Sequence, residues 1–139
     1  MDAEKILEFR KRRNRFCQRL GIELTELSPG YARVVKTVTE EDLNPIGAAH
    51  GGLYFTMADT AAGSALAAHG SQAVTLNAQY SFLRAAKPGD TLTAVAHEVK
   101  HGGTVCVCEV QVTDQDQRLV GTGTGTFTFF DLKKPLDLS

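Results

Sequence analysis

The sequence predicts an α+β domain in which an antiparallel sheet of about six strands wraps around one long central helix, with a second helix at the N-terminus. Residues 51–69 suit a helix but are apolar or small on every side, and a helix that is hydrophobic all round is a buried one. The second half of the chain instead shows short strand-like runs separated by turn-forming residues. An antiparallel sheet packed on such a helix accounts for both patterns.

Length and composition fit one domain, residues 1–139, with 42% hydrophobic and 22% charged residues. The net charge of -1 provides no broad positive field for nucleic acid. Three cysteines without CxxC spacing argue against a disulfide scaffold and favour a reducing compartment, so a cytoplasmic location is expected. We expect no signal peptide, because the N-terminus carries acidic residues early and lacks an apolar region. We expect no membrane span either, because an Asp inside segment 51–70 would cost roughly 2.5–3.5 kcal/mol.

Residues 2–20 are expected to form an amphipathic helix that begins at the cap Asp2 and ends at Gly21. Its apolar residues fall near one stripe: Ile6, Phe9, Phe16 and Leu20. The basic residues between positions 10 and 15 are expected on the solvated face, and the alternative is that they hold ligand phosphates.

Six strands are expected along the chain. Two of them, 22–27 and 31–38, flank a Ser-Pro-Gly turn and form a hairpin. Four more follow the long helix, at residues 73–83, 91–100, 104–113 and 119–130.

Two of these strands carry patterns that could suggest a ligand. Cys106 and Cys108 share one strand face, but no four-ligand spacing accompanies them, so they are expected to be small buried hydrophobes and no metal is expected. Gly121, Gly123 and Gly125 alternate within the last strand. Their spacing predicts a sheet surface that the central helix or a partner chain approaches closely.

Asp59 is the only charged residue of the long helix. A buried carboxylate needs donors or shifts its pKa, so Asp59 is a candidate general base or nucleophile. The alternative is a structural Asp that accepts hydrogen bonds from a Thr or a neighbouring loop.

His50-Gly51-Gly52 stands at the start of the same helix. Glycines leave backbone N–H groups uncovered where the helix dipole favours negative charge, which suits an oxyanion hole for a carbonyl substrate. The alternative is an entry turn without a ligand. Because Gly51 and Asp59 are separated by about 12 Å of helical rise, one carbonyl group cannot touch both within one chain. Cooperation between them therefore predicts a homodimer with two antiparallel helices and two shared sites.

Residues 44–52 read Asn44-Pro-Ile-Gly-Ala-Ala-His50-Gly51-Gly52, and Asp59 follows after six residues. This spacing resembles the pattern N-x-x-G-x-x-H-G-G-x6-D of the phenylacetate-pathway (PaaI-like) hotdog thioesterases. The segments 80–84 and 87–90 and the strand around Phe127 are similar to that family as well, so the resemblance covers roughly residues 20–130.

The resemblance implies hydrolysis of an acyl-CoA to a carboxylic acid and free CoA, without metal or redox cofactor. Asp59 would be the base or nucleophile, and the Gly51 N–H would polarise the thioester carbonyl. Asn44 would orient water or the carbonyl, His50 would brace the loop, and Thr75 would help to position water. Substrate would contact Gly52, Phe82, Arg84, Lys87, Lys100, Gly102, Gly103 and Thr104. The dimer would pair further into a tetramer.

The family pattern leaves alternatives open. Some hotdog thioesterases have a Thr one turn after the acid, where this chain has Gly63. Hotdog hydratases use an Asp–His pair in a motif that is missing from this sequence. A non-catalytic acyl-CoA sensor, or a purely structural protein, would have no need for Asp59. The acyl group is not determined by the sequence.

Overall fold

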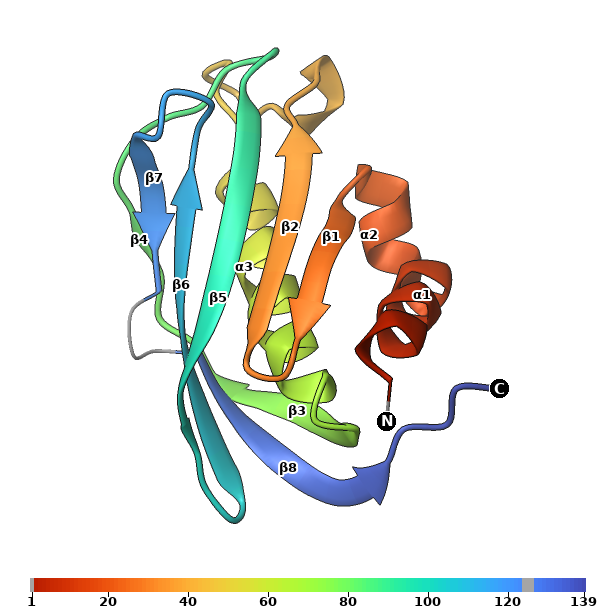
Figure 1. Ribbon diagram of the computed structural model, residues 1–139. Helices are drawn as coiled ribbons and strands as arrows, with labels where there is room; N and C mark the ends of the chain where they lie inside the picture. The colour runs from red at the N-terminus through yellow and green to blue at the C-terminus, as the bar shows by residue number, and fades with distance from the viewer. Residues whose placement is uncertain (1, 124–126) are drawn as a thin grey trace.

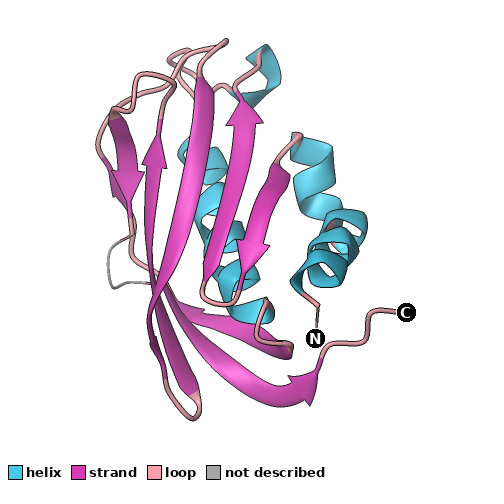
Figure 2. Cartoon of the chain, viewed as in Figure 1, coloured by secondary structure: helices cyan, strands magenta, loops and turns pink. Residues whose placement is uncertain are grey.

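The computed structural model describes residues 2–123 and 127–139, and it confirms the expected hotdog architecture (Figure 1). The helical elements are α1 (Ala3–Arg13), α2 (Arg15–Leu20), the 3-10 turn η1 (Glu40–Asp42) and α3 (Gly51–Ala67). The strands are β1 (Glu23–Ser28), β2 (Tyr31–Thr37), β3 (Ser71–Asn77), β4 (Ser81–Phe82), β5 (Thr91–His101), β6 (Val105–Thr113), β7 (Leu119–Thr122) and β8 (Phe127–Pro135). Figure 2 shows the curved sheet on one side of α3 and the N-terminal helices beyond it.

Strand pairing explains why two predicted strands are each divided. The described strands are all antiparallel, in the order β1-β2-β5-β6-β7-β4, while β8 pairs with β6 and with β3. The first half of β6 pairs with β8 and its second half with β7. The sheet therefore divides at β6 into two parts, or flaps: one contains β7 and β4, and the other contains β8 and β3. The predicted strand 73–83 becomes β3 and β4, one in each flap, and the predicted strand 119–130 becomes β7 and β8.

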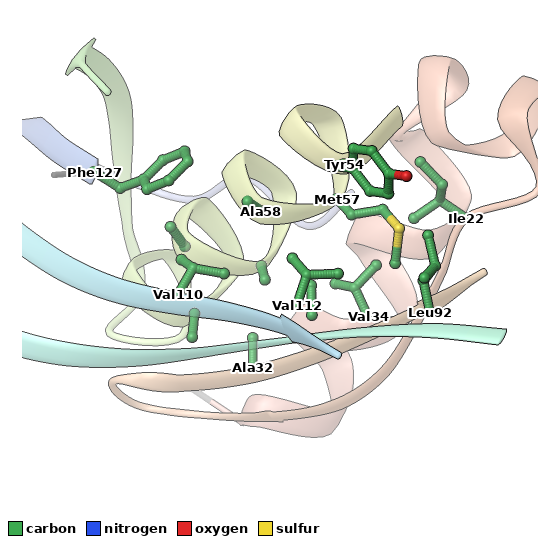
Figure 3. Packing of buried hydrophobic residues seen from close by; sticks show 14 of the residues in the cluster. Ile22, Ala32, Val34, Tyr54, Met57, Ala58, Leu92, Val110, Val112 and Phe127 are labelled. Atoms are coloured by element: carbon green, nitrogen blue, oxygen red, sulfur yellow. The ribbon is translucent and has the colours of Figure 1, made fainter. Parts of the chain in front are cut away.

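The core lies between α3 and the concave face of the sheet, as Figure 3 shows. Ala58, Ala61, Ala62 and Ala65 are fully buried along α3. Because these side chains are methyl groups, the strands can approach the helix on several sides at normal packing density. Met57 fills the space toward Val34, Leu92 and Val112 (Figure 3).

The N-terminal segment is two helices rather than the single helix predicted for residues 2–20. Asn14 ends α1, and its side chain caps α2 by accepting a hydrogen bond of 3.2 Å from the Cys17 N–H. Asp2 and Gly21 cap the outer ends as expected, Gly21 in the left-handed conformation. Because the break changes the direction of the second helix, Phe16 leaves the predicted apolar stripe and is 53% exposed.

The three cysteines are free and buried, as expected of small hydrophobes. Burial raises the pKa of Cys108 to about 12, so that thiol stays protonated at neutral pH.

At Gly121, within the glycine face, the predicted close approach is made by a tyrosine of the same chain. A Cβ atom added at Gly121 would collide with the Tyr80 ring and hydroxyl. Tyr80 in turn packs edge-on against Phe82, with ring centroids 4.8 Å apart. Gly125 lies outside the described residues. The missing side chain at Gly121 therefore sets the position of an aromatic pair beside α3.

We expect Gly121→Ala to lower the free energy of unfolding by about 1–3 kcal/mol, because the added methyl group overpacks the space that Tyr80 fills. Urea unfolding followed by circular dichroism measures the change. Gly103→Ala is the matched control, since an added Cβ there meets no atom within 4 Å. Equal losses in both variants would show that the Tyr80 contact is unimportant for stability.

Candidate functional site

The start of α3 presents one backbone N–H group to solvent. His50 caps the helix, and its Nδ1 accepts a hydrogen bond of 2.8 Å from the Gly52 N–H. The first N–H groups of a helix have no acceptor within the helix, and the Gly51 N–H finds none elsewhere in residues 2–123 and 127–139. Gly51, rather than Gly52, is therefore the donor available to a ligand at the positive end of the helix dipole.

The ring of Phe82 lies against this donor. A Cβ atom at Gly51 would be 3.1 Å from the Phe82 ring, and the Tyr54 ring lies 6.1 Å from Phe82 between centroids. Position 51 therefore accommodates no side chain unless Phe82 moves. The structure brings together two residues, Gly51 and Phe82, that the sequence assigned to one site.

Asn44 holds the loop that leads into α3. Its Oδ1 accepts hydrogen bonds of 3.1 Å from the N–H groups of both Ile46 and Ala48. Its own N–H donates to the Ala48 carbonyl at 2.7 Å. The side-chain NH2 group of Asn44 remains available to a ligand, whereas its carbonyl oxygen is occupied by the loop.

A buried ion pair that sequence analysis missed supports the same loop. Lys36 Nζ lies 3.1 Å from Asp42 Oδ2, and both side chains are buried. The Asp42 carboxylate also accepts from the Thr39 N–H at 2.7 Å, while its backbone carbonyl accepts from the His50 N–H at 2.8 Å. The available signal was Lys36 itself, which shares the inward-facing alternation of β2 with Ala32 and Val34.

Asp59 lies on the flank of α3 that faces β3. Thr75 Oγ1 donates a hydrogen bond of 2.8 Å to Asp59 Oδ1, so the structure brings these two candidate residues together. The same contact fits the alternative of a structural Asp that accepts a hydrogen bond from a Thr. The carboxylate is half-buried, not buried as expected, because it borders an open cavity of about 410 Å³ that Gly63 and Phe129 also line. Ligand atoms can therefore reach Asp59 directly.

Arg10 extends from α1 into the wall of this cavity, although the basic residues of that helix were expected to be solvated. Its Nε donates a hydrogen bond of 2.9 Å to Ser64 Oγ on α3. Burial lowers the pKa of Arg10, while Cys17 and the Asp59 carboxylate favour its charged form. The overlooked signal is helical spacing: Arg10 is four residues after the buried Ile6 and so shares its face.

The predicted substrate-binding residues form two groups, which lie at opposite ends of the sheet. Arg84 and Lys87 belong to the loop 83–90, which is bound to the start of α3 because Ala86 donates to the Tyr54 hydroxyl at 2.8 Å and accepts from the Ala49 N–H at 2.9 Å.

The other group, Lys100, Gly102, Gly103 and Thr104, forms the β5–β6 turn at the opposite end of the sheet (Figure 1). This turn lies near the end of α3, where the rings of His101 and His69 stack with centroids 4.1 Å apart. One chain thus brings neither these two groups nor Gly51 and Asp59 together.

His69, Glu98 and His101 form the one potential metal-ligand cluster within the described ranges. His69 Nε2 and Glu98 Oε1 are hydrogen-bonded at 2.9 Å, and the potential ligand atoms of the three residues all lie within 4.8 Å of one another. The hydrogen bond and the stacking of His101 on His69 describe this cluster. The absence of a metal stays a prediction.

A family model described as the thioesterase superfamily matches residues 46–121, which include the helix start, Asp59, Thr75 and the loop 83–90. The chain belongs to this superfamily. The PaaI-like resemblance seen in the sequence is thereby confirmed, and the chain is placed among thioesterase enzymes.

Two relatives have named activities. The acyl-coenzyme A thioesterase PaaI of Escherichia coli is 43% identical over 84 residues, which are 60% of this chain and 59% of that protein. Human acyl-coenzyme A thioesterase 13 is 33% identical over 114 residues, which are 80% of this chain and 81% of that protein. The matched part of this chain spans less than two thirds of the bacterial relative's length.

Solved structures agree over more of the chain. That of E. coli PaaI, from the phenylacetic acid degradation operon, superposes with a TM-score of 0.91 and 30% identity over 97% of this chain and 96% of that one. A hypothetical thioesterase protein of Streptococcus pneumoniae, solved with coenzyme A, has a TM-score of 0.78 and 34% identity over 83% and 91%.

We expect Lys36→Met to lower the free energy of unfolding by about 3–5 kcal/mol, because it leaves the buried Asp42 carboxylate without its counter-charge. Urea unfolding measures this loss, and hydrogen exchange should show faster exchange of the His50 amide. Arg33→Met, on the opposite face of β2, is the control. A Lys36 variant as stable as this control would contradict the supporting role of the ion pair.

Proposed function

We propose that this protein hydrolyses an acyl-CoA thioester to a carboxylic acid and CoA, with Asp59 as the reacting carboxylate. The supporting observation is the Asp59–Thr75 hydrogen bond at the edge of an open cavity, in a chain of the thioesterase superfamily. The named activities of the E. coli and human relatives support the acyl-CoA substrate, as does the coenzyme A in the S. pneumoniae structure.

Each site residue has a role that fits its contacts. The Gly51 N–H would donate to the thioester oxygen and stabilise the oxyanion. Asp59 keeps Oδ2 for the reaction while Thr75 holds Oδ1. The Asn44 NH2 group would orient water or the carbonyl, and His50 keeps the helix start in shape through its bond to Gly52.

The chemistry balances in two ways. Asp59 either takes a proton from water, whose oxygen adds to the carbonyl carbon, or attacks that carbon itself and forms a mixed anhydride that water then opens. In both, the C–S bond breaks and the CoA thiolate takes up a proton. Label found in Asp59 after a single turnover in ¹⁸O-labelled water identifies the anhydride route, with water adding to the Asp59 carbonyl carbon, because the general-base route leaves no label there.

We propose further that the working unit is a homodimer. Gly51 and Asp59 are eight residues apart on one helix, about 12 Å in rise, so one thioester can contact both only across two chains. Within the described part of the chain, β3 pairs with β8 alone, and its other edge is unpaired. Val74 and Leu76 on β3 are 49% and 51% exposed. An apolar unpaired edge is a template for pairing with another strand.

In the same two-fold dimer, the two groups of predicted substrate-binding residues could contact one ligand. Arg84 and Lys87 of one subunit and Lys100 with the turn 102–104 of the other would lie toward the same site, where the phosphates of coenzyme A need cations. Assembly of dimers into a tetramer stays a prediction.

The alternatives have less support. A hotdog hydratase would need the Asp–His pair of its own hydration motif, and that motif is missing from the sequence. A sensor would have no need for a carboxylate held by a hydroxyl at the cavity edge. No helix in residues 2–123 and 127–139 is long and apolar enough to cross a membrane. A cytoplasmic location stays a prediction.

We expect Asp59→Asn to reduce kcat/KM by about 10²–10⁴, because the amide can neither take the proton nor attack. Binding of a non-hydrolysable acyl-CoA thioether should persist, as calorimetry can measure. Asp116→Asn, at an exposed turn, is the matched control. Unchanged turnover by the Asp59 variant would refute the mechanism.

Mixing two inactive variants tests the shared site. Gly51→Pro removes the N–H at a first helical position where proline is favoured, and its ring also requires Phe82 to move. Asp59→Asn removes the carboxylate. After joint refolding at equal amounts, half of the dimers would be mixed and each would hold one intact site. Activity should therefore return to about a quarter of wild type. No recovery in a mixture shown by mass spectrometry to contain mixed dimers would mean that each site lies within one chain.

A further inference from the structure

A second cavity, of about 290 Å³, lies beneath the N-terminal helices. Apolar side chains, among them Ile22 and Leu24, form part of its lining. Three residues, Arg10, Asn14 and Thr60, line both this cavity and the one that contains Asp59. The two cavities are therefore neighbours that share a wall, and that wall carries a guanidinium group.

Arg10 has hydrogen-bonding capacity to spare. A guanidinium carries five N–H donors, and within the described part of the chain Arg10 makes one hydrogen bond, from Nε to Ser64 Oγ. Arg10 lines both cavities, and its terminal nitrogens are not among the buried polar atoms that lack a partner in the described residues. They are therefore open to the cavities and can bind an acceptor atom brought by a ligand.

The terminal nitrogens of Arg10 lie beside Gly63. A Cβ atom at Gly63 would be in ordinary van der Waals contact with Arg10 Nη2, at 3.6 Å, and with the Phe129 ring, at 3.5 Å. Gly63 follows Asp59 by four residues, about 6 Å along the axis of α3. An extended chain of about five bonds, at about 1.2 Å per bond, covers that distance.

We propose that Arg10 is a specificity-determining residue that binds an oxygen on the acyl group, about five to six bonds beyond the thioester carbonyl. The substrate class is an acyl-CoA whose chain carries a hydroxyl, keto or carboxylate oxygen, with the hydrocarbon part directed toward the cavity beneath the N-terminal helices. This inference rests on the proposed function, since it assumes that the carbonyl lies at Asp59.

Arg10 could instead act only on Asp59, as a neighbouring positive charge that supports the carboxylate. That role would affect every substrate equally, because the reacting carboxylate is common to all. Recognition of an acyl oxygen affects only substrates that carry one. A comparison of substrates therefore separates the two roles.

The test compares hexanoyl-CoA, 6-hydroxyhexanoyl-CoA and adipoyl-CoA on wild type and Arg10→Met. We expect the variant to lose about 10- to 100-fold in kcat/KM on at least one of the two oxygen-bearing esters, the range for hydrogen bonds to charged groups. Its kcat/KM on hexanoyl-CoA should stay within about threefold of wild type. The hydroxyl and carboxylate esters show which oxygen Arg10 prefers.

Two further variants complete the experiment. Arg15→Met, on an exposed position of α2, should change no ratio. Ser64→Ala removes the acceptor that orients Arg10 and should reduce the same selectivity in part, without removing the cation. It also keeps the test valid if Arg10→Met does not fold.

Equal losses on all three esters, or a wild type without preference for either oxygen-bearing ester, would overturn the proposal. Failure of the proposed function looks different, because wild type would then hydrolyse none of the three.

Discussion

The burial of α3 within the sheet is the constraint on which the rest of the structure depends. Ala58, Ala61, Ala62 and Ala65 have no exposed surface, so the face of the helix that carries them is closed by the sheet, and only one flank of α3 stays open. A polar side chain within such a helix can reach solvent only where the sheet opens. Asp59 occupies that flank, beside β3, and Gly51 lies at the uncovered end. The same packing that stabilises the domain thus restricts chemistry to two places.

Much of the fold could be predicted from the sequence, because buried segments and turns have recognisable residue patterns. The apolar helix, the hairpin at residues 28–30 and the order of the strands follow from local patterns, and the motif from Asn44 to Asp59 identifies the family. The first and last residues of β7 and β8 do not follow from local patterns, because they depend on which half of β6 each strand pairs with. Those of β4 depend in turn on its pairing with β7. That choice is made by sheet curvature, which has no local signature.

The missed residues share a physical cause. Arg10 and Lys36 are long cations, and a long cation on a helix or strand is normally solvated. Each is buried here because an acceptor from a distant segment meets it: Ser64 for Arg10 and Asp42 for Lys36. Periodicity places both on inward faces, but it does not identify the partner. Thr75, which the family pattern singled out, contacts Asp59 from a distant strand, and local periodicity alone does not reveal such a long-range contact.

The loop 83–90 and the start of α3 are tied by two hydrogen bonds through Ala86, one to the Tyr54 hydroxyl and one from the Ala49 N–H. These bonds make the loop and the helix terminus one mechanical unit. A molecule held at one point by Arg84 or Lys87 would therefore keep its distance from the Gly51 N–H as the protein fluctuates. Such a fixed separation raises the effective molarity of the donor at the bound group, because the loss of relative motion occurs during folding and not during reaction.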